Sequence, residues 1–218
     1  MKIYISADME GVTGVTHWDE VEHNKPTFFN QFQDNMTKEV VAACEGALEA
    51  GAREIWVKDA HYSGRNILSD QLPKEVKLIR GWSGHPYSMV QELDSSFNAL
   101  IMIGYHSMAG KGGNPLAHTM SSAKIDSIFV NNQPTSEFFL HGNIAAKHNI
   151  PVYVDPKQNN YDSYRGVRLF KPNLIEFNAI VEDKKFGELP KSGFLFKEYI
   201  DCEILLLTLG ADGMSLYH

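Results

Sequence analysis

The strongest constraint on the fold is the alternation along the chain of short apolar runs and segments with helical periodicity. Apolar runs of strand length occur at residues 2–7, 54–58, 100–103, 127–130, 151–154, 167–170 and 203–209. Helical patterns follow several of these runs, at residues 37–51, 137–147 and 173–181. The first of them predicts a helix with Thr37 as its N-cap and Gly51 as its stop. This alternation is typical of an α/β protein, so we expect a layered sheet with helices on both faces.

Composition excludes several classes of protein. The 218 residues are 43% hydrophobic and 22% charged, which is enough for a full core without disulfides or structural metals. The net charge of -7 and the absence of a long basic run argue against a nucleic-acid partner. The N-terminal residues do not resemble a signal peptide, and no apolar run reaches the ~18 residues of a membrane helix. Because Cys44 and Cys202 also resemble reduced core thiols, we expect a cytoplasmic protein with no membrane partner.

Polar residues follow three of the apolar runs at the point where each run ends. Asp8 and Glu10 follow the first, Asp59 and His61 the second, and His106 the third. Residues i and i+2 of an extended segment point the same way, and ligands bind at the carboxyl ends of strands in open α/β sheets. Each motif alone is more often a solvated acid or a structural histidine. Together, these carboxylates and imidazoles favour a site for a divalent transition metal at the C-terminal ends of the strands.

Further polar residues leave several interpretations open. His118, after the glycine-rich segment 107–114, is a candidate ligand, acid/base group, oxyanion donor or ordinary loop residue. Glu137 begins a helical pattern, where an acid often only complements the helix dipole. Residues 63–66 (Ser-Gly-Arg-Asn) could hold substrate, although a turn explains them equally well. The remaining internal histidines are interpreted as structural or solvated: His17, His23, His85, His141 and His148. No phosphate-binding loop, serine elbow or CxxC pair is present.

Six short motifs, in this order, resemble the D-aminopeptidase family of zinc metallopeptidases, peptidase family M55. They are Asp8-Met9-Glu10-Gly11, Asp59-Ala60-His61, Pro86-Tyr87-Ser88-Met89-Val90, Gly104-Tyr105-His106, His118-Thr119-Met120, and Asn132-Gln133-Pro134 with Glu137. Each motif is short, but their order and spacing make the resemblance specific. It extends over residues 1–148, which we expect to form a D-aminopeptidase-like metal-binding domain.

The resemblance implies a site with two Zn²⁺ ions per chain. It implies that Asp8 bridges the two ions, that Glu10 and His61 ligate one, and that His106 and Glu137 ligate the other. His118 corresponds to the family's catalytic histidine. The implied reaction is hydrolysis of N-terminal D-amino acids, D-alanine especially, from short peptides by metal-activated water. The resemblance also implies a homo-oligomer, ring-like in the family.

The last 70 residues resemble a different family, the ribokinase-like (PfkB) sugar kinases of ADP-heptose synthesis. The motifs are Ile150 to Lys157, Tyr164-Arg165-Gly166, Lys171-Pro172-Asn173 with Glu176, and Thr208 to Met214. The sugar-binding half of such kinases and their Gly-Ala-Gly-Asp segment have no counterpart. We therefore expect residues 149–218 to form a strand-helix-strand segment packed on the first domain, joined near residues 141–150. The alternatives to a peptidase are a nucleotide-binding fragment of a sugar kinase and an inactive fusion product.

Overall fold

The computed structural model of the chain confirms the mixed α/β fold, and it describes residues 1–112, 115–154 and 161–218. The described helices are α1 (Pro26–Glu49), α2 (Glu137–Lys147), α3 (Leu174–Lys184) and α4 (Lys191–Ile200). The described strands are β1 (Lys2–Ala7), β2 (Glu54–Asp59), β3 (Val76–Ile79), β4 (Ala99–Ile103), β5 (Phe129–Val130), β6 (Gln133–Pro134), β7 (Val152–Val154), β8 (Leu169–Phe170), β9 (Ile204–Thr208) and β10 (Met214–Tyr217). The chain divides into a first unit, Met1–His106 with Leu140–Pro151, and a second unit, Ser107–Phe139 with Val152–His218.

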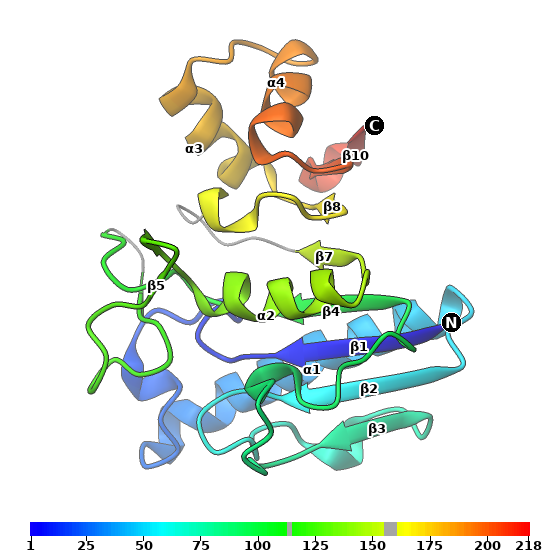
Figure 1. The fold of residues 1–218 in the computed structure, drawn as a ribbon, viewed down its shortest axis with the longest axis vertical. Coiled ribbons are helices and arrows are strands. Elements are labelled where there is room, and N and C mark those ends of the chain that lie inside the picture. The colour runs from blue at the N-terminus through cyan, green and yellow to red at the C-terminus, as the bar shows by residue number, and fades with distance from the viewer. Residues whose placement is uncertain (113–114, 155–160) are drawn as a thin grey trace. The chain divides into compact units, whose positions relative to one another are not determined.

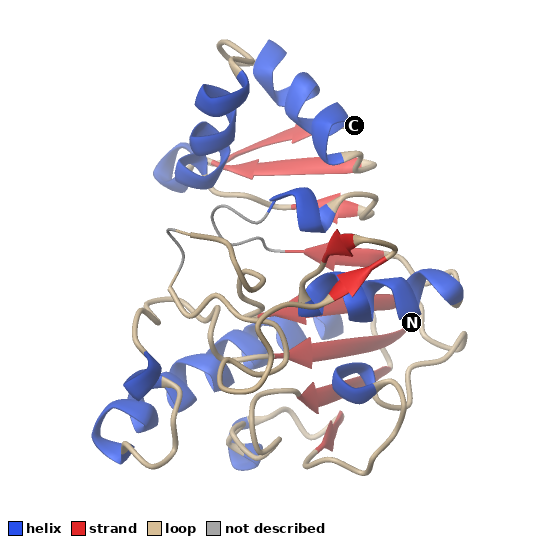
Figure 2. Ribbon diagram, turned by 60° about the vertical axis from the view of Figure 1, so that its left-hand side comes forward, coloured by secondary structure: helices blue, strands red, loops and turns tan. Residues whose placement is uncertain are grey.

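The first unit is built on four parallel strands in the order β4-β1-β2-β3. β1 lies in the middle, and its Ile5 is opposite both Val57 of β2 and Ile101 of β4. Helix α1 lies on one face of these strands and α2 on the other (Figures 1 and 2). Because both faces are covered, the strands read as continuous apolar runs rather than as an alternation. Because the strands are parallel, the carboxyl ends of β1, β2 and β4 lie at one edge of the sheet.

Helix α1 is longer than the sequence pattern predicts. It begins at Pro26, and the expected start at Thr37 is wrong. Proline fits the first turn of a helix because its missing N–H needs no partner there. Thr37 lies inside the helix, where its hydroxyl donates to the carbonyl of Gln33 and accepts from the N–H of Leu68, so it does not cap the helix. The predicted C-terminal end is confirmed, since Glu49 is the last helical residue and Gly51 adopts a φ of 88°.

β1 and β4 are joined tightly where they end. The N–H of Asp8 donates to the carbonyl of Ile103 at 2.9 Å, and the N–H of Gly11 donates to that of Gly104 at 2.7 Å. Gly104 has a φ of 66°, and a Cβ there would overlap the carbonyl of Asp8. Only glycine therefore allows the two strand ends to approach so closely.

Replacing Gly104 by alanine is expected to lower the free energy of unfolding by about 3 kcal/mol or more, because left-handed strain adds to a backbone clash. Urea unfolding of the purified chain measures the loss. Gly51→Ala is the matched control, since Gly51 also has a positive φ but a Cβ there meets nothing within 4 Å. It should cost about 1–2 kcal/mol. Equal losses in the two variants would contradict the close approach at Gly104.

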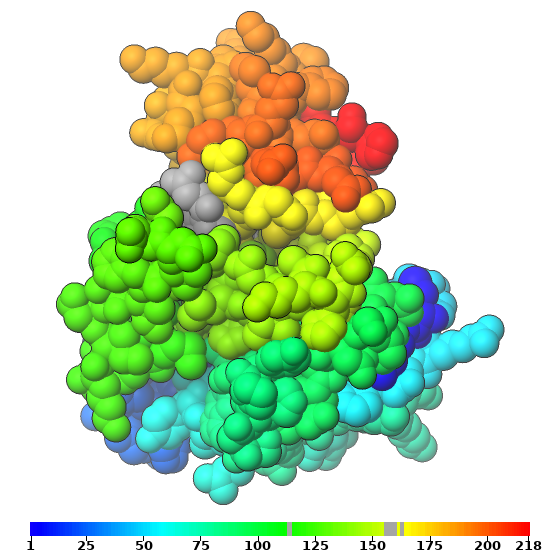
Figure 3. All heavy atoms as spheres, viewed as in Figure 1, coloured from blue at the N-terminus to red at the C-terminus, as the bar shows by residue number. Residues whose placement is uncertain are grey.

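The second unit contains parallel strands β7, β8 and β9, and β10 pairs antiparallel with β9. Helices α3 and α4 contact β9, and residues 174–200, in amber to orange, make up much of the face of this unit that Figure 3 shows. Its core is aromatic, with Phe196 between Phe177 and Phe170 at ring-centroid distances of 5.0 and 5.8 Å. The expected strand at residues 127–130 is the short β5, which forms a hairpin with β6. The patterns did not predict β3, α4 or β10.

Other expectations concern the chain as a whole. Cys44 and Cys202 are both buried and free, as predicted. Within the described ranges, no helix combines the length and the hydropathy needed to cross a membrane. The chain passes between the two compact units after His106, after Phe139 and after Pro151. The compact units do not test the predicted domains, because residues 1–148 and 149–218 were divided by their resemblance to two families. That division stays a prediction.

Candidate metal centre

The first two candidate residues lie just past the C-terminal end of β1. Asp8 and Glu10 are both buried, with 2% and 8% of their surface exposed. The N–H of Met9 donates to Asp8 Oδ1 at 2.9 Å, which orients that carboxylate. A Cβ at Gly11 would lie 2.5 Å from the carbonyl oxygen of Tyr105, so glycine lets the chain turn away against β4. Two carboxylates are thereby held in the interior of the protein.

His61, two residues beyond β2, faces both carboxylates. Its Nδ1 lies 2.9 Å from Glu10 Oε2 and 3.3 Å from Asp8 Oδ1. Its Nε2 lies 2.8 Å from the carbonyl oxygen of Val21. Because a carbonyl oxygen only accepts, Nε2 carries the hydrogen, and in the neutral ring Nδ1 bears the lone pair. The imidazole thus points Nδ1 at the carboxylates, as a hydrogen-bond donor when the ring is protonated and as a ligand atom when it is neutral.

His106 brings the third strand end to the same place. Its Nε2 lies 3.5 Å from Asp8 Oδ2, and only 4% of the residue is exposed. The preceding residue is held by a hydrogen bond of 2.7 Å between the Tyr105 hydroxyl and Ser6 Oγ. Ser6 in turn donates to the carbonyl of Met89, within the motif of residues 86–90. Asp8 therefore lies between the two imidazoles.

The electrostatics of the cluster are dominated by its negative charge. Burial alone would raise the pKa of Glu10, but attraction to His61, with smaller contributions from His106 and Asp8, holds that pKa well below its usual value. Burial alone would lower the pKa of His61, but Glu10 and Asp8 raise it well above the ordinary value. The two carboxylates thus favour a positive charge at the centre of the group.

The donor set fits a divalent transition metal such as zinc. Asp8, Glu10 and His61 each offer one ligand atom, and these atoms lie within 4.8 Å of one another. Carboxylate oxygen and imidazole nitrogen are ordinary zinc ligands. A histidine ligand commonly donates its other ring N–H to a carbonyl, which is what His61 does with Val21. Together with His106, whose Nε2 lies near Asp8, these three residues could hold a metal ion in the first unit.

Asp59, two residues before His61, does not orient the imidazole. Its carboxylate instead accepts from the N–H groups of Asn66 and Ile67 and from the side-chain amide of Asn66. Asn66 also donates to the carbonyl of His61 at 2.6 Å. Asp59 therefore shapes the loop that carries His61, while the imidazole itself is oriented by Val21.

His118 and Glu137 lie together in the second unit. His118 Nε2 is 3.8 Å from Glu137 Oε1, and both residues are buried. His118 Nδ1 lies 2.8 Å from the carbonyl of Leu116, so Nδ1 carries the hydrogen. Glu137 Oε1 accepts from the N–H of Met120 at 2.5 Å, which ties the carboxylate at the start of α2 to the loop. The two sequence candidates outside the first unit are thus neighbours of each other.

The sequence patterns did not reveal two contributors to the centre. The carbonyl of Val21 belongs to the backbone, which no side-chain motif identifies. Asn66 is part of a segment with two equal interpretations, substrate binding or a turn, and the structure shows it bonded within the turn. The polar residues around Asn66 indicated that this segment could matter. The role of the Val21 carbonyl has no counterpart in the sequence.

Comparisons with known proteins place most of the chain in one family. A model of the D-aminopeptidase family, Peptidase_M55, matches residues 1–154. The D-aminopeptidase of Bacillus subtilis (strain 168) is 31% identical over 152 residues, which are 70% of this chain and 54% of that protein. The chain thus spans about half the length of this curated relative.

Two further likenesses concern the fold and the kinase resemblance. A solved structure described as "Zn-dependent D-aminopeptidase DppA from Bacillus subtilis, a self-compartmentalizing protease" has a TM-score of 0.66 at 24% identity, over 92% of this chain and 73% of that one. It shares the fold. The bifunctional protein HldE of Photorhabdus laumondii is 44% identical over 73 residues, 33% of this chain and 15% of that protein, which confirms a partial similarity to such kinases. Because the family model covers 154 of the 218 residues, the chain belongs to the D-aminopeptidase family, peptidase family M55.

Proposed function

We propose that this chain is a zinc-dependent aminopeptidase that hydrolyses N-terminal D-amino acids, of the D-alanine type, from short peptides. The observation that carries the proposal is the buried group of Asp8, Glu10, His61 and His106 at three strand ends in a member of this family. The description of the structural neighbour as Zn-dependent supports zinc as the metal. The nitrogen and oxygen donors of the group suit that ion.

The individual roles follow the residue-by-residue resemblance. In the proposed site Asp8 would be shared by two zinc ions, and Glu10 and His61 would hold one of them. His106 and Glu137 would hold the other, and His118 would be the catalytic histidine. The contacts of Asp8 with both imidazoles support its bridging role. The pairing of His118 with Glu137 within the second unit is consistent with a shared function.

The proposed mechanism needs no side-chain nucleophile. When bound, zinc supplies polarisation of the scissile carbonyl and activation of a water molecule. The chain's own residues position the groups and move protons. The hydrogen bond from His118 Nδ1 to Leu116 holds that ring, so Nε2 is the atom that can take up and release a proton. Nε2 would take a proton from the attacking water and pass it to the developing oxyanion or to the leaving amine, a contribution of about 10²- to 10⁴-fold in rate.

Zinc analysis combined with a peptide assay tests the proposal. The purified chain should contain about two zinc ions, as a two-metal hydrolase requires. A chelator should abolish the release of D-alanine from D-alanyl-glycyl-glycine, and added zinc should restore it. The matched control substrate is L-alanyl-glycyl-glycine, which should remain uncleaved. Undiminished hydrolysis by the metal-free chain would contradict the proposal.

Other outcomes of the same preparation favour the alternatives. A chain that unfolds cooperatively but neither binds zinc nor cleaves either peptide would favour an inactive fusion product. Binding of ATP in a calorimetric titration, without peptidase activity, would favour a nucleotide-binding fragment.

We also propose that the chain forms a homo-oligomer. The structural neighbour is described as a self-compartmentalizing protease, which supports this proposal. Sedimentation velocity of the zinc-loaded chain measures the mass of the assembly.

A further inference from the structure

A cavity of about 470 Å³ lies in the first unit beside the loop that carries His61. This volume is within the range of small-molecule sites in proteins. The cavity is lined by part of α1 and by two segments that lie close in the sequence to His61 and to Val21, whose carbonyl contacts the His61 imidazole. One is the loop of residues 62–66, directly after His61, and the other contains His23, two residues beyond the carbonyl of Val21. The cavity is therefore lined by neighbours in the sequence of His61 and Val21, while none of the four residues of the metal centre is among its lining residues.

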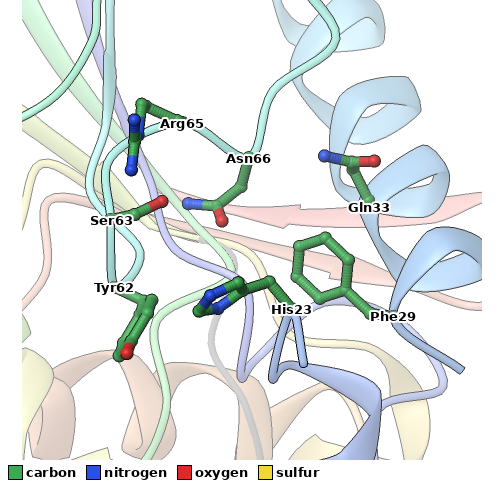
Figure 4. Close-up of a pocket in the computed structure, with 7 residues that line it drawn as sticks. All are labelled: His23, Phe29, Gln33, Tyr62, Ser63, Arg65 and Asn66. Atoms are coloured by element: carbon green, nitrogen blue, oxygen red, sulfur yellow. The ribbon is translucent and has the colours of Figure 1, made fainter. Parts of the chain in front are cut away.

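The lining combines one cation with apolar surface. Arg65, Ser63 and Tyr62 lie along one side of the opening, while Phe29 and Gln33 from α1 lie on the other (Figure 4). No Asp or Glu is among the lining residues, and no ion pair with a carboxylate is recorded for Arg65 among the described residues. The neighbouring centre, in contrast, contains the carboxylates of Asp8 and Glu10. Arg65 therefore supplies a positive charge to a lining from which these carboxylates are absent.

The loop that presents Arg65 is held rigidly. Gly64 packs against Gly81, and the N–H of Gly81 donates to the carbonyl of Gly64 at 2.7 Å. Tyr62 adopts a φ of 42°, which is uncommon for a residue with a side chain, and Trp82 Nε1 donates to its carbonyl at 2.7 Å. Preorganisation of this kind lowers the entropic cost of binding a ligand. These features distinguish the segment from a loose surface turn.

We propose that this cavity binds the carboxylate end of a short zwitterionic peptide, with the Arg65 guanidinium pairing with the free C-terminal carboxylate. A guanidinium can bind a carboxylate through two parallel hydrogen bonds. The rings of Phe29 and Tyr62 provide apolar contact for the residues between the two ends of the peptide. The proposal rests on the proposed peptidase function, and it adds that the enzyme selects short peptides with a free C-terminus.

Removal of the cation tests the proposal in the full-length, zinc-loaded chain. For Arg65→Gln, KM for D-alanyl-glycyl-glycine should rise about 10- to 100-fold, as expected for a lost charge-assisted hydrogen bond. KM for the C-terminal amide of the same peptide should not change. Arg65→Lys, which keeps the charge but not the forked geometry, should restore part of the affinity for the free acid. Arg53→Gln is the matched control, because Arg53 is an exposed arginine just before β2, at the opposite end from His61.

The outcomes separate this proposal from the function on which it rests. Equal changes for the acid and the amide, or no change for either, would overturn the role of Arg65. If the unsubstituted chain cleaves neither peptide, the proposed function fails. The cavity is then tested by calorimetric titration of D-alanyl-glycyl-glycine into the zinc-free chain and its Arg65→Gln variant. Binding that is equally strong, or undetectable, in both proteins would overturn the proposal.

Discussion

Replacing Asp8 by asparagine is expected to remove most of the bound zinc and to lower kcat/KM by at least about 1,000-fold, since even outer-shell partners of metal ligands contribute 10- to 100-fold. The substitution preserves volume but removes the negative charge between two imidazoles. If the amide oxygen keeps its hydrogen bond from Met9, the NH₂ group takes the place of Oδ2, which lies 3.5 Å from His106 Nε2. An N–H donor then takes the place of the Asp8 oxygen that would bind the second zinc ion.

Elemental analysis and the peptide assay measure both effects of this change. Asp94→Asn is the matched control, because Asp94 is an exposed carboxylate of the same unit that accepts hydrogen bonds only from Ser96 among the described residues. That variant should keep its zinc and its activity. An Asp8→Asn protein with full zinc content and activity would show that the metal centre lies elsewhere.

Replacing His118 by alanine is expected to lower kcat by about 10²- to 10⁴-fold, the range for a general acid or base. The zinc content and KM should change little, because the proposed role of His118 is to move a proton rather than to hold the metal. This separation of kcat from zinc content distinguishes the effect from that of Asp8→Asn. Steady-state kinetics with D-alanyl-glycyl-glycine and elemental analysis of the same preparation measure it.

A histidine outside the site provides the control for His118. His85 lies in the first unit, where its Nδ1 accepts from the N–H of Tyr87, and His85→Ala should leave kcat unchanged. A His118→Ala protein that loses its zinc would instead indicate that His118 is a ligand. Unchanged kcat in this variant would remove His118 from the mechanism.

Local patterns predicted most of the elements that position the centre. β1 and α2 lie at the predicted residues, and β2 and β4 differ from their predicted bounds by one residue each. Each of these elements is identified by its own periodicity. The start of α1 was missed although the signal was present, because Pro26 and the buried Phe29 and Phe32 continue the helical spacing upstream of Thr37.

The elements that the patterns did not predict depend on their partners. β3 is four residues long and only partly buried, so its apolar pattern is weak. β10 exposes Met214 and Leu216, and it is a strand because it pairs with β9. Pairing between strands is a tertiary interaction, which a short window of sequence does not contain.

The sequence by itself determined that Asp8, Glu10, His61 and His106 follow three buried strands, and that these side chains therefore meet at one edge of a parallel sheet. Only the tertiary structure decided how they are oriented. Val21, forty residues from His61 in the chain, supplies the carbonyl that leaves Nδ1 facing the carboxylates. The position of a backbone carbonyl depends on the path of a loop rather than on the identity of its side chain. The path of a loop also decides that the Asp59 carboxylate accepts hydrogen bonds from Asn66 and does not orient an imidazole.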